Sequence, residues 1–130
     1  MEEKEKKKWL WVGKIAKKTL ARAIDLVHEG MPVLELAEKL EDYIRNYAVP
    51  AFPVNISINY VAAHYSPGIN DSSVIPAKSI VKVDVGVHKE GYIADAAISI
   101  ALTSEHEDLL KASFEALINA EKALKAGVKT

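Results

Sequence analysis

The chain has 130 residues, a length that suits a single domain with its own core. Its formal net charge is -1 with 27% charged residues, so no strong overall field favours nucleic acid or anionic lipid as a partner. Cysteine is absent, which excludes disulfides, thiolate metal sites and a cysteine nucleophile. No long apolar run predicts a membrane span or a secretory leader, so we expect a cytoplasmic protein.

Two amphipathic helices are predicted in the first third of the chain. Residues 1–8 are a charged N-terminal segment, which we expect to be a frayed first helical turn or a disordered end. From Trp9 to Val27 apolar residues recur at helical spacing, and Gly30 and Pro32 mark the boundary to a second helix. Such apolar stripes usually form core, so neither helix is expected to carry a cofactor site.

A strand, a loop and a third helix surround the centre of the chain. Residues 54–63 alternate and are rich in β-branched side chains, which is typical of a strand. Residues 64–73 are dense in turn-forming residues and predict a loop. Ser104 and Glu107 have the spacing of a capping box, which predicts a helix that ends at Gly127.

Residues 81–102 predict a β-hairpin with one apolar face. In its first strand four valines alternate with polar or small residues, so Lys82, Asp84, Gly86 and His88 share the second face. In its second strand Asp95 stands on the face opposite the larger apolar residues. Both aspartates therefore belong to the polar face of the predicted hairpin.

The turn decides how the two aspartates meet. A two-residue turn at Lys89-Glu90 places Asp84 directly opposite Asp95. A three-residue loop that includes Gly91 moves Asp95 into the valine face instead. Burying an unpaired carboxylate costs several kcal/mol, so the hydrophobic pattern favours the two-residue turn with the aspartates side by side.

Two adjacent carboxylates repel each other unless a cation lies between them, and oxygen ligands suit divalent metals. Small neighbours on the same face, Gly86, Ala97 and Ser99, are expected to leave room for one. The alternative is a solvated pair at a sheet edge without function.

Two histidines are further candidates. His88 lies roughly 13 Å from Asp84 along an extended strand, too far to share an ion. His64, in the loop after a strand, is compatible with a structural or a catalytic role.

Four motifs together resemble type II methionine aminopeptidases of the archaeal kind, from about residue 9 to the end of the chain. They are Ala51-Phe52-Pro53, Ser57-x-Asn59, Ala62-Ala63-His64-Tyr65-Ser66-Pro67 and Asp84-x-Gly86-x-x-x-x-Gly91-x-x-x-Asp95. The resemblance implies an α/β (α+β) fold: half of a pita-bread fold, with a mainly antiparallel sheet and the helices packed on one face. Residues 9–130 would be the N-terminal half of the catalytic domain, with the second half absent.

The resemblance also implies a function, the removal of N-terminal methionine from nascent proteins. Asp84 and Asp95 would bind two divalent ions (Co, Mn, Fe or Zn), and a water held by these ions would be the nucleophile. His64 would hydrogen-bond the scissile amide, and Phe52 would form a wall of the methionine pocket. No nucleic-acid or membrane partner is expected.

The same resemblance places the remaining metal ligands, one histidine and two glutamates, beyond residue 130. The chain alone is therefore expected to bind metal weakly or not at all and to be inactive. Its partner would be the missing half or a second copy. Two alternatives stay open: a non-catalytic pita-bread-like binding module, and a half-domain that associates with itself.

Overall fold

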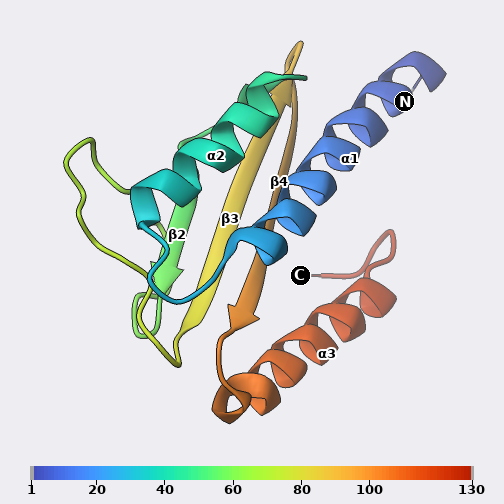
Figure 1. Cartoon of the computed structure of the whole chain (residues 1–130). Coiled ribbons are helices and arrows are strands. Elements are labelled where there is room, and N and C mark those ends of the chain that lie inside the picture. The colour runs from blue at the N-terminus through green and yellow to red at the C-terminus, as the bar shows by residue number, and fades with distance from the viewer. Residues whose placement is uncertain (1, 130) are drawn as a thin grey trace.

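A computed structural model describes residues 2–129, which form a four-stranded antiparallel sheet with helices on both sides (Figure 1). Strand β3 is central: β1 and β2 pair with different parts of one of its edges, and β4 pairs along the other. The elements in chain order are α1 (Glu3–Leu26), α2 (Val33–Arg45), β1 (Val49–Pro50), β2 (Asn55–Ile58), β3 (Ile80–Lys89), β4 (Tyr92–Ala101), a 3-10 turn η1 (Ser104–His106) and α3 (Glu107–Ala123).

The core lies between the valine face of β3 and the first two helices. All four valines predicted to share that face are fully buried, at 0% exposure: Val81, Val83, Val85 and Val87. Helix α2 contributes Leu36, Leu40 and Ile44, which are also fully buried. The alternation read from the sequence is therefore confirmed, and it directs Asp84 and its neighbours to the opposite face of the sheet.

Helix α1 begins earlier than expected, at Glu3, so most of the charged N-terminal segment is helical. The Glu5 carboxylate accepts a hydrogen bond from the Glu2 backbone N–H at 2.9 Å, which satisfies one of the free donors at the helix start. Trp9 and Ile24, predicted for the apolar stripe, are 46% and 50% exposed. Val12 and Ala16 of the same stripe are buried as predicted, and Ile15, Thr19 and Ala23 complete the buried side of the helix.

Helix α3 departs from the prediction that all helices pack on one sheet face. None of its described residues is buried. Three of its large apolar side chains and the C-cap Leu124 are more than half exposed; the three are Leu109, Phe114 and Leu117. Its start shares a hollow with Lys82 and Ser99, which belong to the polar face. The predicted Ser104 cap is also wrong, because the Thr103 hydroxyl accepts from the Glu105 N–H at 3.4 Å and opens η1 instead.

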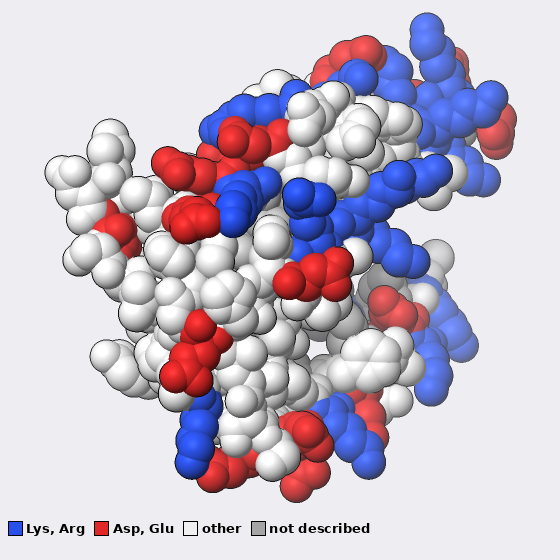
Figure 2. Space-filling model, viewed as in Figure 1, with Lys and Arg blue, Asp and Glu red and all other residues white. Residues whose placement is uncertain are grey.

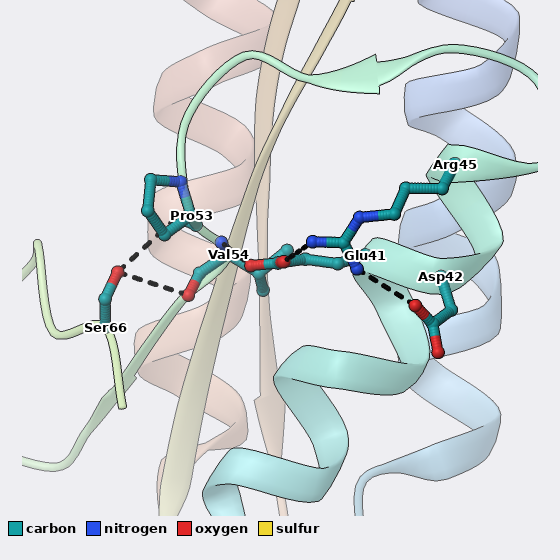
Figure 3. A network of polar contacts seen from close by, with 6 residues as sticks. All are labelled: Glu41, Asp42, Arg45, Pro53, Val54 and Ser66. Carbon is teal, nitrogen blue, oxygen red and sulfur yellow. Dashed lines mark hydrogen bonds and ion pairs between the residues drawn. The ribbon is translucent and has the colours of Figure 1, made fainter. Parts of the chain in front are cut away.

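A polar network ties the chain after β1 to helix α2 (Figure 3). The Glu41 carboxylate accepts from the Val54 backbone N–H at 3.0 Å and pairs with Arg45 at 2.5 Å. The Ser66 hydroxyl lies 3.4 Å from the carbonyl oxygens of both Pro53 and Val54. These contacts hold the loop that carries residues 64–73 against β2. Among residues 2–129, no helix is both long and apolar enough to cross a membrane.

Candidate metal and peptide site

The hairpin turn sets the register of the candidate site. It consists of Glu90 and Gly91, both in the left-handed region with φ of 52° and 87°, so that Lys89 pairs with Tyr92. Positive φ at both central residues is the requirement of a type I′ turn, and Gly91 adopts it without strain. The predicted turn at Lys89-Glu90 is therefore wrong by one residue. The pairing moves by two residues, which keeps every side chain on its predicted face.

The two aspartates lie diagonally across the strand pair instead of directly opposite each other. Asp84 pairs with Ala97 and Asp95 pairs with Gly86, so the predicted Asp84–Asp95 pairing is wrong. Both side chains remain on the same face, and diagonal neighbours in an antiparallel pair are roughly 7–8 Å apart between backbones. Two carboxylates at that spacing can reach a common ion between them.

Asp84 is the more enclosed of the two carboxylates. Burial raises the pKa of Asp84, and the negative charge of Asp95 raises it further, whereas His64 and Lys82 lower it. Within the part of the chain that the structure describes, its Oδ1 is buried and accepts no hydrogen bond. A buried, unpartnered acceptor beside a second carboxylate is unfavourable without a cation. These two residues therefore fit a divalent metal.

His64 lies in the loop after β2, near enough for its charge to lower the pKa of Asp84. Its φ of 67° lies in the left-handed region, which few non-glycine residues adopt, and its side chain is exposed. The following residue holds it in place, because the Tyr65 carbonyl accepts from the Ile56 N–H at 2.7 Å and the Tyr65 hydroxyl donates to Asp71. His88 has a different role: its Nε2 accepts from the Gly91 N–H at 3.1 Å and supports the turn.

Phe52 covers the backbone of β3 beside the aspartates. The Ala51 N–H donates to the Gly86 carbonyl at 2.9 Å, which brings the Phe52 ring over Gly86. A Cβ built at Gly86 would lie 2.4 Å from Phe52 Cε1, so only glycine fits under the ring. We expected Gly86 to leave room for a ligand, but Phe52 occupies that space. The ring is half-buried, and it lies beside the strand position that pairs with Asp95.

Sequence reasoning did not single out Asn55, the β2 residue that pairs with Asp84. Asn55 is 9% exposed, and its side-chain amide donates to the Pro53 carbonyl at 3.0 Å. The alternation of Asn55, Ser57 and Asn59 in a β-branched stretch is the signal that could have placed these polar residues on the aspartate face.

The described residues do not form a complete metal centre. Within residues 2–129, no group of three or more His, Cys, Asp or Glu side chains converges closely enough to hold an ion. Asp84 and Asp95 could therefore supply only part of a ligand set, and His64 is not grouped with them. Two carboxylates, a nearby imidazole and an aromatic wall can bind a cation and orient a peptide.

Comparisons with known proteins identify the family of the chain. Residues 11–130 match metallopeptidase family M24. The chain is 45% identical over 123 residues to a methionine aminopeptidase of Pyrococcus abyssi. The aligned region covers 94% of this chain but only 42% of that protein.

Solved structures share the fold. A methionine aminopeptidase of Thermotoga maritima superposes with a TM-score of 0.90 at 22% identity, covering 99% of this chain and 56% of that one. An X-Pro aminopeptidase of Thermotoga maritima gives 0.83 at 23% identity, with 98% and 37% covered. These are pita-bread aminopeptidases, and the chain spans part of their fold. The chain that carries the aspartate hairpin thus belongs to metallopeptidase family M24.

Proposed function

We propose that this chain supplies the N-terminal half of a type II methionine aminopeptidase, which removes the first methionine of nascent proteins with divalent metal ions. The observation that carries the proposal is the buried, unpartnered Oδ1 of Asp84 beside Asp95. The 45% identity to a protein named methionine aminopeptidase favours this substrate over X-Pro peptides, because the X-Pro enzyme resembles the chain in fold alone. The type II assignment rests on Phe52-Pro53 and on residues 62–65, Ala-Ala-His-Tyr.

Asp84 and Asp95 are the residues of this chain that would hold the metals. Carboxylate oxygens accept Mn, Co, Fe or Zn with little discrimination, so the aspartates alone do not select one of them. Bound divalent ions would supply a water molecule of lowered pKa and would polarise the scissile carbonyl. Asp84 is the firmer anchor, since it is fixed between β2 and β4 by its neighbours Asn55 and Ala97.

His64 and Phe52 would position the peptide. His64 lies close enough to lower the pKa of Asp84, so its imidazole can donate a hydrogen bond to an amide bound at the aspartates. Its left-handed backbone is the kind of conformation that persists where surrounding contacts enforce it, often at functional sites. The Phe52 ring offers an apolar surface beside Asp95, which suits the unbranched side chain of methionine.

The isolated chain would be incomplete for this reaction. It spans 42% of the length of the Pyrococcus abyssi relative, and we propose that the remainder supplies one histidine and two glutamates. Two carboxylates alone leave a divalent ion mostly hydrated, so the chain alone would bind metal weakly and turn over no substrate. The exposed apolar residues of α3 are consistent with an additional polypeptide packing there.

The test is a peptidase assay on this chain fused to the remaining part of the Pyrococcus abyssi relative. With Mn²⁺ or Co²⁺ the fusion should release methionine from a Met-Gly peptide, and a chelator should stop the release. Asp95→Asn should lower kcat/KM by at least about 100-fold, since it removes a proposed ligand without changing side-chain size. Glu90→Gln, which neutralises another acid of the same hairpin, should leave turnover unchanged.

Full turnover by Asp95→Asn would refute the metal assignment. Cleavage of an X-Pro peptide in preference to the Met-Gly peptide would instead refute methionine as the substrate while leaving the metallopeptidase chemistry intact.

A further inference from the structure

The small net charge of the chain conceals an uneven distribution. Residues 2–26 contain eight basic and four acidic side chains, whereas the remainder contains nine basic and fourteen acidic ones. In Figure 2 the blue side chains gather along helix α1, most densely around its N-terminal end. The basic charge is therefore concentrated on one element of the fold, on the side of the sheet that α1 and α2 cover.

Within α1 the cations follow one line, which we name the basic stripe. Successive members are separated by three, seven, four and four residues, a spacing that keeps them on one side of a helix. The line is about 27 Å long at the helical rise of 1.5 Å per residue. All five members are exposed: Lys4, Lys7, Lys14, Lys18 and Arg22.

The basic stripe is not neutralised by the chain itself. Among residues 2–129 none of its five members forms an ion pair, although Lys8, Lys39 and Arg45 all do. Lys14 and Arg22 each lie four residues from Lys18, and like charges at this spacing destabilise a helix by about 0.2–0.5 kcal/mol per pair. An unpaired line of cations that carries such a penalty suits an external anion.

A hollow of about 300 Å³ adjoins the N-terminal end of the stripe and adds a further cation. It is lined by Lys4, Lys7 and Lys8 from α1 together with Lys89 and Glu90 from the hairpin, and Glu90 pairs with Lys8. The Lys89 Nζ lies 4.1 Å from the centre of the Trp11 ring, which is also in its wall. The ammonium group thus covers one face of the indole, and that face cannot stack on a nucleobase.

We propose that the basic stripe binds the phosphodiester backbone of double-stranded nucleic acid. A straight line of cations about 27 Å long can contact several successive phosphates, and such contacts do not depend on base sequence. Single-stranded binders present free aromatic faces, which the covered Trp11 does not provide. An anionic membrane is the poorer fit, because the apolar side of α1 is buried in the core through Val12, Ile15 and Ala16.

The location of the stripe separates this surface from the aspartate site. Helix α1 packs on the valine face of the sheet, whereas Asp84 and Asp95 lie on the opposite face. A nucleic acid on the stripe would therefore leave the peptide site open. The expectation from the sequence that no nucleic acid is bound rested on the charge averaged over the whole chain, which does not register a local line of cations.

The experiment measures binding of the 130-residue chain to 20-base-pair RNA and DNA duplexes by fluorescence anisotropy at several salt concentrations. With about four phosphate contacts, the dissociation constant should rise roughly 100-fold between 50 and 200 mM salt. The stripe variant Lys14→Gln/Lys18→Gln should weaken binding at least about tenfold and lower the salt slope by about two. The matched variant Lys6→Gln/Lys17→Gln removes the same charge from other sides of α1 and should change binding less than about threefold.

The two duplexes identify the source of the phosphates. Tighter binding of either duplex assigns the stripe to that nucleic acid, and equal binding assigns it to the backbone that they share. Equal losses in both double variants would overturn the proposal, because binding would then follow net charge alone. Stronger binding to phosphatidylserine vesicles than to either duplex would overturn it in favour of a membrane surface. Circular dichroism of both variants checks that α1 remains folded.

Discussion

Replacing Gly86 by alanine tests how Phe52 is held over the aspartate hairpin. The added Cβ would lie 2.4 and 2.6 Å from two ring carbons of Phe52 and 2.9 Å from the Ala51 Cβ. Ordinary contacts are 3.4–4 Å, so the ring must retreat by about 1 Å. The hydrogen bond from the Ala51 N–H to the Gly86 carbonyl restrains that movement. Overpacking of this kind typically costs about 1–3 kcal/mol in the free energy of unfolding.

Urea unfolding followed by circular dichroism measures this loss, together with the double variant Phe52→Ala/Gly86→Ala. Without the ring the two closest contacts of the added Cβ disappear, so the penalty of the alanine at position 86 should fall by about half or more. Gly13→Ala is the matched control: nothing lies within 4 Å of its added Cβ, and it should stabilise helix α1 by about 0.5–1 kcal/mol. A Gly86→Ala chain as stable as the parent would refute the close approach of Phe52.

Three further variants probe individual interactions. Asp84→Asn should raise the free energy of unfolding at pH 7. Burial and Asp95 raise the pKa of Asp84, so the parent loses stability as the pH rises above 3.8, the ordinary pKa of an aspartate. Thermal unfolding should show the gain at pH 7 and not at pH 3. Glu41→Ala should cost about 1–3 kcal/mol in urea unfolding, whereas Glu41→Gln, which keeps an acceptor for the Val54 N–H, should cost less than about 1 kcal/mol. His64→Gly should stabilise the chain by up to about 1 kcal/mol, since glycine adopts a φ of 67° without strain. A less stable variant would contradict strain at this position. The same variant should impair the fused peptidase.

Alternation was enough to predict which face of the hairpin each residue occupies. The four valines of β3 define the buried face clearly, because shifting the strand pairing by one residue would move an aspartate into that face. The structure confirms that all four valines are buried. A shift of the pairing by two residues keeps both faces intact, so the hydrophobic pattern alone cannot detect it. The preference of Gly91 for positive φ within a two-residue turn was the missing information, and it moves Asp84 from Asp95 to Ala97.

Contacts between distant segments account for the rest of what the sequence did not predict. Phe52 fills the space above Gly86 because the Ala51 N–H, between β1 and β2, bonds to the Gly86 carbonyl of β3, a contact that no local pattern indicates. The charge of His64 acts on Asp84 only because a loop of irregular residues folds back along β2. Helix α3 carries a regular apolar stripe, yet its residues remain exposed, since periodicity predicts an apolar side and not what covers it.

Titration of the 130-residue chain with Mn²⁺, followed by broadening of its backbone amide NMR signals, tests most directly whether Asp84 and Asp95 bind metal together. The broadening should centre on these two residues and reach His64, and it should disappear in Asp84→Asn/Asp95→Asn while persisting in Glu90→Gln. Broadening that centres on other acidic residues, or that survives in the double variant, would contradict a metal site at the hairpin.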